Sequence, residues 1–160
     1  MGTTIGKSAL LSAAAGAAGT AMIRGMMKAS QQFAPETLPP IKEDPGHFMV
    51  KQAKRVLPSN VEISEKTEEL AAGALAFGYG MTLAGLYGAA RPRAGNTWLE
   101  GTGLGLATWA VGYLGWLPAT KLAPPVWKHE TKQVVPGILS HVLFGIATVA
   151  LFKWAKDKLD

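Results

Sequence analysis

A single histidine, His141, lies well inside one of the long uncharged stretches of this 160-residue chain. It falls about two helical turns into the run 133–152, which contains no Asp, Glu, Lys or Arg. An ionisable side chain in such a segment is costly to bury and is by default a functional hypothesis. Either the imidazole handles protons or a ligand, or it stays neutral and fixes helix packing by bonding Ser140 or a hydroxyl or carbonyl of a neighbouring helix. We favour the structural role and keep proton handling open.

Two charged residues at the edges of other uncharged runs complete the candidate polar site. Glu100 stands at the start of one run, and Arg24 stands at the end of another. Glu100 can form an ion pair with Arg91 or Arg93 across a short turn, and we expect this pairing rather than a transport role. Together with His141, these residues form our candidate intramembrane polar site.

Other arrangements that carry chemistry are missing from the sequence. The absence of cysteine excludes thiol nucleophiles, disulfides and iron–sulfur clusters. Haem held by two imidazoles needs a second histidine at membrane depth, but His47 and His129 lie in polar loops. His129-Glu130 has no second histidine four residues after the first, as a zinc-protease helix requires. With no nucleophile elbow and no paired carboxylates in one run, we expect no enzyme, no cofactor and no metal.

Nucleotide and nucleic-acid binding are also disfavoured. The string GTGLGL at 101–106 resembles a dinucleotide-binding loop, but no strand precedes it and no acidic residue follows at the expected spacing. The net charge of +5 would suggest nucleic acid in a soluble protein. Here the basic residues gather near the ends of apolar runs, so anionic lipid headgroups explain them better.

The uncharged runs have the length of membrane-spanning helices. About 20 helical residues cover roughly 30 Å, the hydrocarbon thickness of a bilayer. Tryptophans, which prefer the membrane interface, flank or end the third run at Trp98, Trp116 and Trp127. We therefore predict one transmembrane domain over residues 1–160, an all-α integral membrane four-helix bundle. Its spans are expected at residues 5–28, 68–90, 97–118 and 134–155.

The first span also has features of a secretory signal peptide, because a single lysine precedes an alanine-rich apolar core. The apolar character continues through Met26 and Met27 to Lys28, which favours a retained helix. Arg24 and Lys28 would then extend their charged ends to one membrane surface.

A long polar loop, residues 29–67, follows the first span. No helix is expected to cross Pro39–Pro40, whereas Asp44 followed by Pro45 is typical of a helix start. We predict a short, basic, amphipathic helix over 46–56. It either lies on the membrane surface or is a solvated helix of the loop.

Small residues at helical spacing predict where the spans touch. Helices in lipid associate through close packing, which favours glycine at their contacts. Gly101 and Gly105 form a G-x-x-x-G pattern in the third span, and Gly73 and Gly80 lie on a small-residue stripe of the second. The turn at 94–96 is so short that it makes these two spans antiparallel neighbours.

Four spans place both termini on one side of the membrane. The basic residues close to the span ends on that side are Lys7, Arg91, Arg93, Lys153, Lys156 and Lys158. Because basic residues next to spans are retained in the cytoplasm, we expect both termini there.

Short motifs in a fixed order resemble those of a known family. They are Leu38-Pro39-Pro40, Gly78-Tyr79, Leu99-Glu100-Gly101 with Gly105, Leu117-Pro118, Leu122-Ala123-Pro124-Pro125-Val126 and Ser140-His141. In this order they resemble the YagU-type small inner-membrane proteins of bacteria, a family linked to acid resistance. The resemblance covers most of the chain and implies a bacterial inner-membrane location with both termini cytoplasmic. It implies no mechanism.

Taken together, these patterns favour a non-enzymatic membrane protein, either an accessory or scaffolding subunit or a stress-related protein such as one of acid resistance. Its expected partners are the lipid bilayer and other membrane subunits or further copies of itself. The alternative is a small transporter or proton-responsive module that uses His141. Transporters more often show inverted repeats, and none is evident in this sequence.

Overall fold

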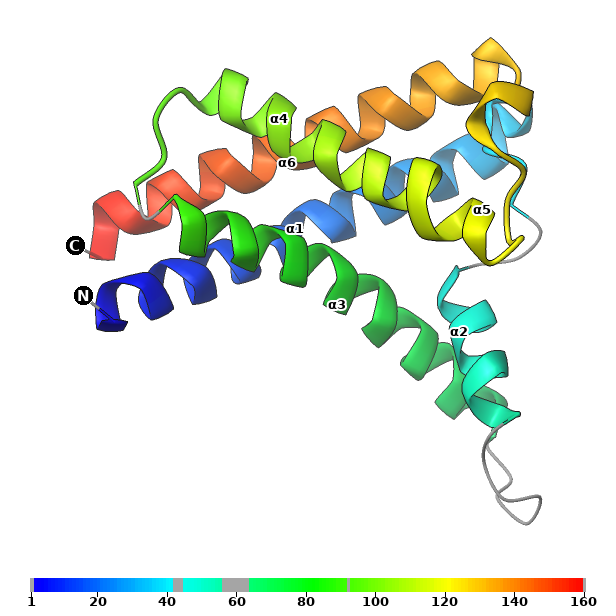
Figure 1. Ribbon diagram of the computed structural model, residues 1–160, viewed down its shortest axis with the longest axis horizontal. Helices are drawn as coiled ribbons and strands as arrows, with labels where there is room; N and C mark the ends of the chain where they lie inside the picture. The colour runs from blue at the N-terminus through cyan, green and yellow to red at the C-terminus, as the bar shows by residue number, and fades with distance from the viewer. Residues whose placement is uncertain (1, 42–44, 56–63, 92, 160) are drawn as a thin grey trace.

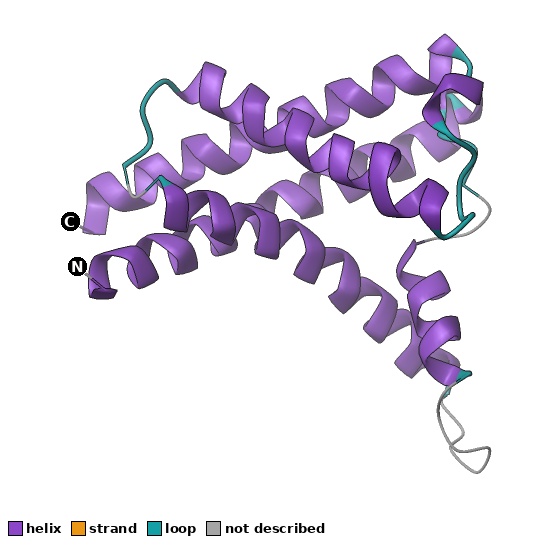
Figure 2. Cartoon of the chain, viewed as in Figure 1, coloured by secondary structure: helices purple, strands orange, loops and turns teal. Residues whose placement is uncertain are grey.

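The computed structural model describes residues 2–41, 45–55, 64–91 and 93–159. All regular structure within these ranges is helical, which confirms the all-α class for the described residues (Figure 2). The longer helices are α1 (Gly2–Phe33), α2 (Pro45–Lys54), α3 (Glu65–Ala90), α4 (Thr97–Ala110) and α6 (Thr131–Leu159). The shorter elements are η1 (Pro35–Thr37), η2 (Val111–Trp116), α5 (Leu117–Ala119) and η3 (Val126–Lys128).

Local signals in the sequence set the ends of these helices. Ser64 caps α3 by accepting a hydrogen bond from the Thr67 amide, and Asn96 caps α4 by accepting one from the Leu99 amide. The helix α1 continues past the expected end at Lys28 and stops at Phe33, two residues before a proline. Asp44, the expected cap of α2, lies outside the described residues.

The third apolar run stays helical over 97–119, but its hydrogen bonding changes midway. The segment η2 is a π-helical turn in which the Leu117 amide donates to the Gly112 carbonyl, five residues back. Pro118 has no N–H to donate to the carbonyl four residues before it, which disrupts ordinary α-helical bonding at this point. Gly115, with φ −102° and ψ −105°, takes up the irregular backbone.

Four of the longer helices, α1, α3, α4 and α6, pack together, and the order in which they neighbour one another differs from their order in the chain. α1 packs against both α3 and α6, and α6 packs against α4 (Figure 1). α3 and α4 run antiparallel, as the short turn requires, but their backbones have few close approaches. Tyrosine side chains bridge them, and the Tyr79 hydroxyl donates to the Thr108 carbonyl at 3.0 Å. The two termini lie at the same end, where Lys7 Nζ donates to the Leu159 carbonyl at 2.8 Å.

Small residues line the two tightest helix contacts. A Cβ atom added to Gly101 would lie 2.5 Å from Ile146 Cα, and one added to Gly105 would overlap the His141 carbonyl. Between α1 and α3, Gly80 lies directly against Thr20. Gly73 differs from these three, because no atom of the described residues lies within 4 Å of the Cβ position there.

The interior of the bundle mixes apolar and hydroxyl side chains, and Leu104, Phe144, Val149 and Phe152 are buried there. The buried polar side chains in the helices include Ser8, Ser12, Thr20, Thr108 and Thr148. Leucines that are 46–75% exposed include Leu10, Leu70, Leu86, Leu99, Leu139 and Leu143. Large exposed apolar surface of this kind marks contact with a membrane or another protein.

Two helices, α3 and α6, are long and apolar enough to cross a membrane. Most of their apolar residues are not buried within the protein, unlike those of a soluble core helix. The alanine, glycine and serine of α1 make it less apolar, and the π turn divides the third run between α4, η2 and α5.

The expected amphipathic helix is present as α2 and packs on protein. Gly46 lies against the backbone of Ala72 in α3, and Val50 is buried. Lys54 forms an ion pair with Glu68 of α3. α2 is therefore docked on α3 and is more than a solvated loop helix. Residue 56, its expected last residue, lies outside the described residues.

Candidate functional site

His141 is half-buried near the middle of the bundle and bonds to its own helix. Its Nδ1 lies 2.8 Å from the Gly137 carbonyl and 3.5 Å from Ser140 Oγ. The contact with Ser140 is one of those expected from the sequence, whereas the described contact with a neighbouring element is aromatic. The ring meets Tyr113 edge to face, with centroids 5.9 Å apart and planes at 86°.

Tyr113 is the centre of an aromatic cluster, which we define as Trp109, Tyr113, His129 and His141. Trp109 stacks on Tyr113 with centroids 5.8 Å apart. On the connector before α6, His129 meets the Tyr113 ring edge to face at 6.3 Å. Tyr113 therefore contacts two imidazoles that come from different elements.

Both imidazoles are held in a defined tautomer by backbone carbonyls. A carbonyl can only accept, so Nδ1 of His141 carries the proton toward Gly137. By the same reasoning Nε2 of His129 donates to the Pro124 carbonyl at 2.8 Å. In each neutral ring the remaining nitrogen is an acceptor, which can take up a proton or bind a hydrogen-bond donor.

The π turn and the connector position this cluster. Tyr113 lies within η2, and π turns occur frequently at functional sites. The following connector folds back through Lys121. Its φ of 59° is the only positive φ of a non-glycine residue among the described residues. Leu122 and Ala123 are buried there together with Leu117, and Tyr113 packs against this group. These contacts bring His129 back toward the bundle.

Glu100 lies in a separate polar cluster at the end of the bundle that holds the termini. Its carboxylate accepts hydrogen bonds from the Tyr87 hydroxyl, the Arg91 guanidinium and the Gly95 amide, the last at 3.1 Å. Its side chain is 14% exposed, whereas that of Arg91 is 55% exposed. Of the two arginines considered from the sequence, Arg91 is the partner. Glu100 thus fastens α3 to the first turn of α4, where an acid also complements the helix dipole.

The three residues of the expected polar site do not form one site among the described residues. His141 belongs to the aromatic cluster, and Glu100 belongs to the cluster with Tyr87 and Arg91. Arg24 is half-buried on α1, and no described residue forms a hydrogen bond or ion pair with it.

Sequence reasoning missed the aromatic partners of His141, although a signal for two of them was present. Gly101, Gly105, Trp109 and Tyr113 follow one another at intervals of four residues. The helix face that packs on α6 through glycine therefore continues directly into the two aromatic rings. His129 gave no comparable signal, because its position depends on how the connector folds back.

The chemistry available at the aromatic cluster is proton uptake and hydrogen bonding. In the part of the chain that the structure describes, no group of three His, Asp or Glu side chains is placed to hold a metal ion.

The chain matches no protein-family model, no curated protein and no solved structure.

Proposed function

We propose that this chain is a multi-pass integral membrane protein whose four-helix bundle serves as a non-catalytic accessory or scaffolding component. Its four spans correspond to α1, α3, the helical stretch from α4 to α5, and α6. The expected partners are lipid and other membrane subunits, and the location suggested by the family resemblance is a bacterial inner membrane. A role in a stress response such as acid resistance rests on that resemblance alone.

The observation that carries this proposal is the large apolar surface that the bundle leaves exposed. Leucines cover the outside, while the contacts between helices combine small and hydroxyl residues with a buried core of Leu104, Phe144 and Val149. In water this arrangement would leave a large apolar surface unprotected. In lipid the outer leucines are solvated by acyl chains, and close packing through small residues holds the helices together.

Extraction of membranes at alkaline pH, followed by affinity purification in mild detergent, tests the proposal. The tagged full-length chain is expected to remain in the membrane pellet and to co-purify with other membrane proteins in fixed proportion. A peripheral protein carrying the same tag is the control and should be released. Release of the chain itself would overturn the membrane assignment, and purification without any partner would overturn the accessory role.

The aromatic cluster supports a second candidate, a proton-responsive module. His141 presents an acceptor nitrogen beside a tyrosine on a π turn, which is an unusual place for an imidazole with only a packing role. Under this candidate, liposomes containing the purified chain would show a pH-dependent ion flux. Flux that is the same with the parent chain and with His141→Phe would exclude His141 as its source.

A further inference from the structure

The π turn of the third apolar run has the features of a hinge. A Cβ atom added at Gly112 would have its nearest neighbour at 3.8 Å, and one added at Gly115 would have it at 3.9 Å, which are ordinary contacts. Unlike Gly101 and Gly105, these glycines do not serve close packing, and they leave the backbone of the turn free to change its angles. Pro118 contributes no backbone donor, so one hydrogen bond of a continuous helix is missing where α5 begins.

The side chain of Tyr79, on α3, contacts this turn at both ends. Its hydroxyl donates to the Thr108 carbonyl at 3.0 Å, in the last turn of α4. The Val111 amide there is shared between the carbonyls of Ala107 and Thr108. The Tyr79 hydroxyl therefore supplements a carbonyl at the point where the helical bonding changes. At the other end of the turn, the Tyr79 ring meets the Trp116 ring edge to face, with centroids 6.3 Å apart.

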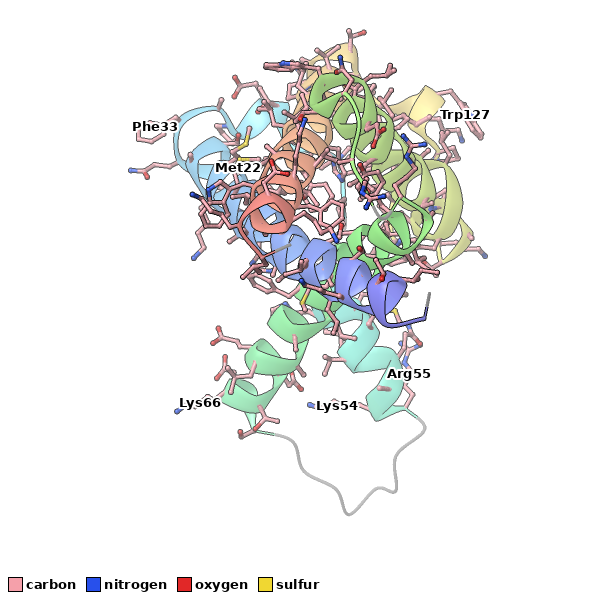
Figure 3. The ribbon with its side chains drawn as sticks, turned by 90° about the vertical axis from the view of Figure 1, so that its left-hand side faces the viewer. Met22, Phe33, Lys54, Arg55, Lys66 and Trp127 are labelled. Carbon is pink, nitrogen blue, oxygen red and sulfur yellow. The ribbon has the colours of Figure 1, made fainter. Side chains whose placement is uncertain are left out.

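α3 has a separate position in the bundle from which it can act on the turn. Its backbone has few close approaches to that of α4. α2 and the first turns of α3 project from the rest of the bundle, with Lys54, Arg55 and Lys66 at their far end (Figure 3). Since Tyr87 bridges α3 and α4 near the termini, Tyr79 is the bridging tyrosine that lies against the π turn.

We propose that the π turn is a hinge held in place by Tyr79, and that through it α3 controls the contact between Tyr113 and its two imidazoles. Tyr113 lies within the turn and touches His129 of the connector and His141 of α6. A π turn holds one residue more than the α-helical pattern, so its relaxation to α-helix turns the residues that follow by about 100°. Release of Tyr79 then moves Tyr113 relative to both imidazoles.

This inference goes beyond both candidate functions, because it concerns how the aromatic cluster is held, whatever partner or ion the protein serves. A partner that displaces α3 would change the surroundings of His129 and His141 without touching either residue. The hinge is thus a route from one face of the bundle to the cluster.

Nuclear magnetic resonance of the full-length chain in detergent, with isotope-labelled histidine rings, tests the proposal. The Tyr113 ring displaces the signals of His129 and His141, and Tyr113→Leu removes this effect and defines the released state. Tyr79→Phe keeps the ring but loses the hydroxyl bond. It is expected to move both signals towards their positions in Tyr113→Leu. The signal of His47, on α2, should stay unchanged and shows that each variant is folded.

Tyr87→Phe is the matched control, because it removes the hydroxyl of the other bridging tyrosine, which donates to Glu100. It should leave the signals of both cluster histidines unchanged. An equal shift of these signals in Tyr87→Phe and Tyr79→Phe would overturn the proposal, since the effect would then not depend on the turn.

A second pair of variants acts on the backbone of the turn itself. Alanine favours regular helix, so Gly115→Ala is expected to shift the two signals in the same direction as Tyr79→Phe. Gly103→Ala, at an exposed glycine of α4, is its control and should shift neither. Should Tyr79→Phe fail to fold, Gly115→Ala decides by the same criterion. Signals that stay at the parent positions in both Tyr79→Phe and Gly115→Ala would overturn the proposal.

Discussion

The imidazole of His141 is oriented by its own helix and contacts its neighbour only through its ring. The bond to the Gly137 carbonyl fixes the ring within α6, whereas the contact with Tyr113 joins α6 to the π turn. Two properties of the side chain can therefore be separated: its aromatic shape and its ability to take up a proton. Phenylalanine keeps the first and removes the second, and leucine removes both.

The first prediction is that His141→Phe retains the stability of the parent in detergent, whereas His141→Leu loses about 0.5–1.5 kcal/mol, the usual size of an aromatic pair. Thermal unfolding of both variants, combined with Tyr113→Leu in a double-mutant cycle, measures the contact. Additive effects of His141→Leu and Tyr113→Leu would show that the two rings do not interact. If both His141 variants fold and lose a pH-dependent flux, the proton-responsive function replaces the packing role.

At the scale of the element, glycine decides which faces of the helices meet. α4 approaches α6 so closely that a side chain at Gly105 would overlap backbone atoms of His141. Gly103, two residues earlier on the same helix, is exposed, and no described atom lies within 4 Å of its Cβ position. The two glycines therefore form a matched pair on one helix.

The second prediction is that Gly105→Ala destabilises the chain by about 1–3 kcal/mol, because α4 and α6 must separate to make room. Gly103→Ala should instead be neutral or stabilise by up to about 1 kcal/mol, since alanine favours the helix. Melting temperatures in the same detergent compare them. Equal effects of the two substitutions would mean that α4 and α6 do not pack as described.

Sequence spacing predicts the helices better than it predicts their contacts. Charge-free length and flanking breakers act locally, and they predict α3 and α6 to within four residues of their bounds. α1 runs five residues past its expected end at 28, and α4 ends at Ala110, eight residues before the expected end at 118, because the π turn begins there. The spacing of small residues does not show which of Gly73 and Gly80 contacts another helix. In the structure Gly80 touches Thr20, while the first part of α3, which holds Gly73, has diverged from α1. The direction in which a helix leaves its neighbour depends on all of its partners, and a single-helix pattern does not contain that information.

At the scale of the whole molecule, the order of the helices around the bundle is also a property of tertiary packing. α1 lies between α3 and α6, although the chain connects it to neither by a short turn. Both termini lie at one end because α1, α3, the stretch from α4 to α5, and α6 run in alternating directions, and this arrangement fits either orientation in a membrane. Phe33, 79% exposed, ends α1, and Trp127, 77% exposed, lies in η3; both segments lie at the end opposite the termini (Figure 1).

The third prediction concerns that orientation and uses the absence of cysteine in the chain. Single cysteines at Glu36 and Lys128 should react with a membrane-impermeant reagent on intact cells, and one at Gly95 should react only after permeabilisation. All three positions are exposed. Glu36 is preferred over the neighbouring Thr37 as the labelling site, because Thr37 is half-buried and its hydroxyl donates to the Ala34 carbonyl. The reasoning is that basic residues are concentrated near the span ends at the Gly95 end, which favours the cytoplasm. The reverse pattern would invert the orientation, and labelling of Glu36 and Gly95 from the same side would show that α3 does not cross the membrane.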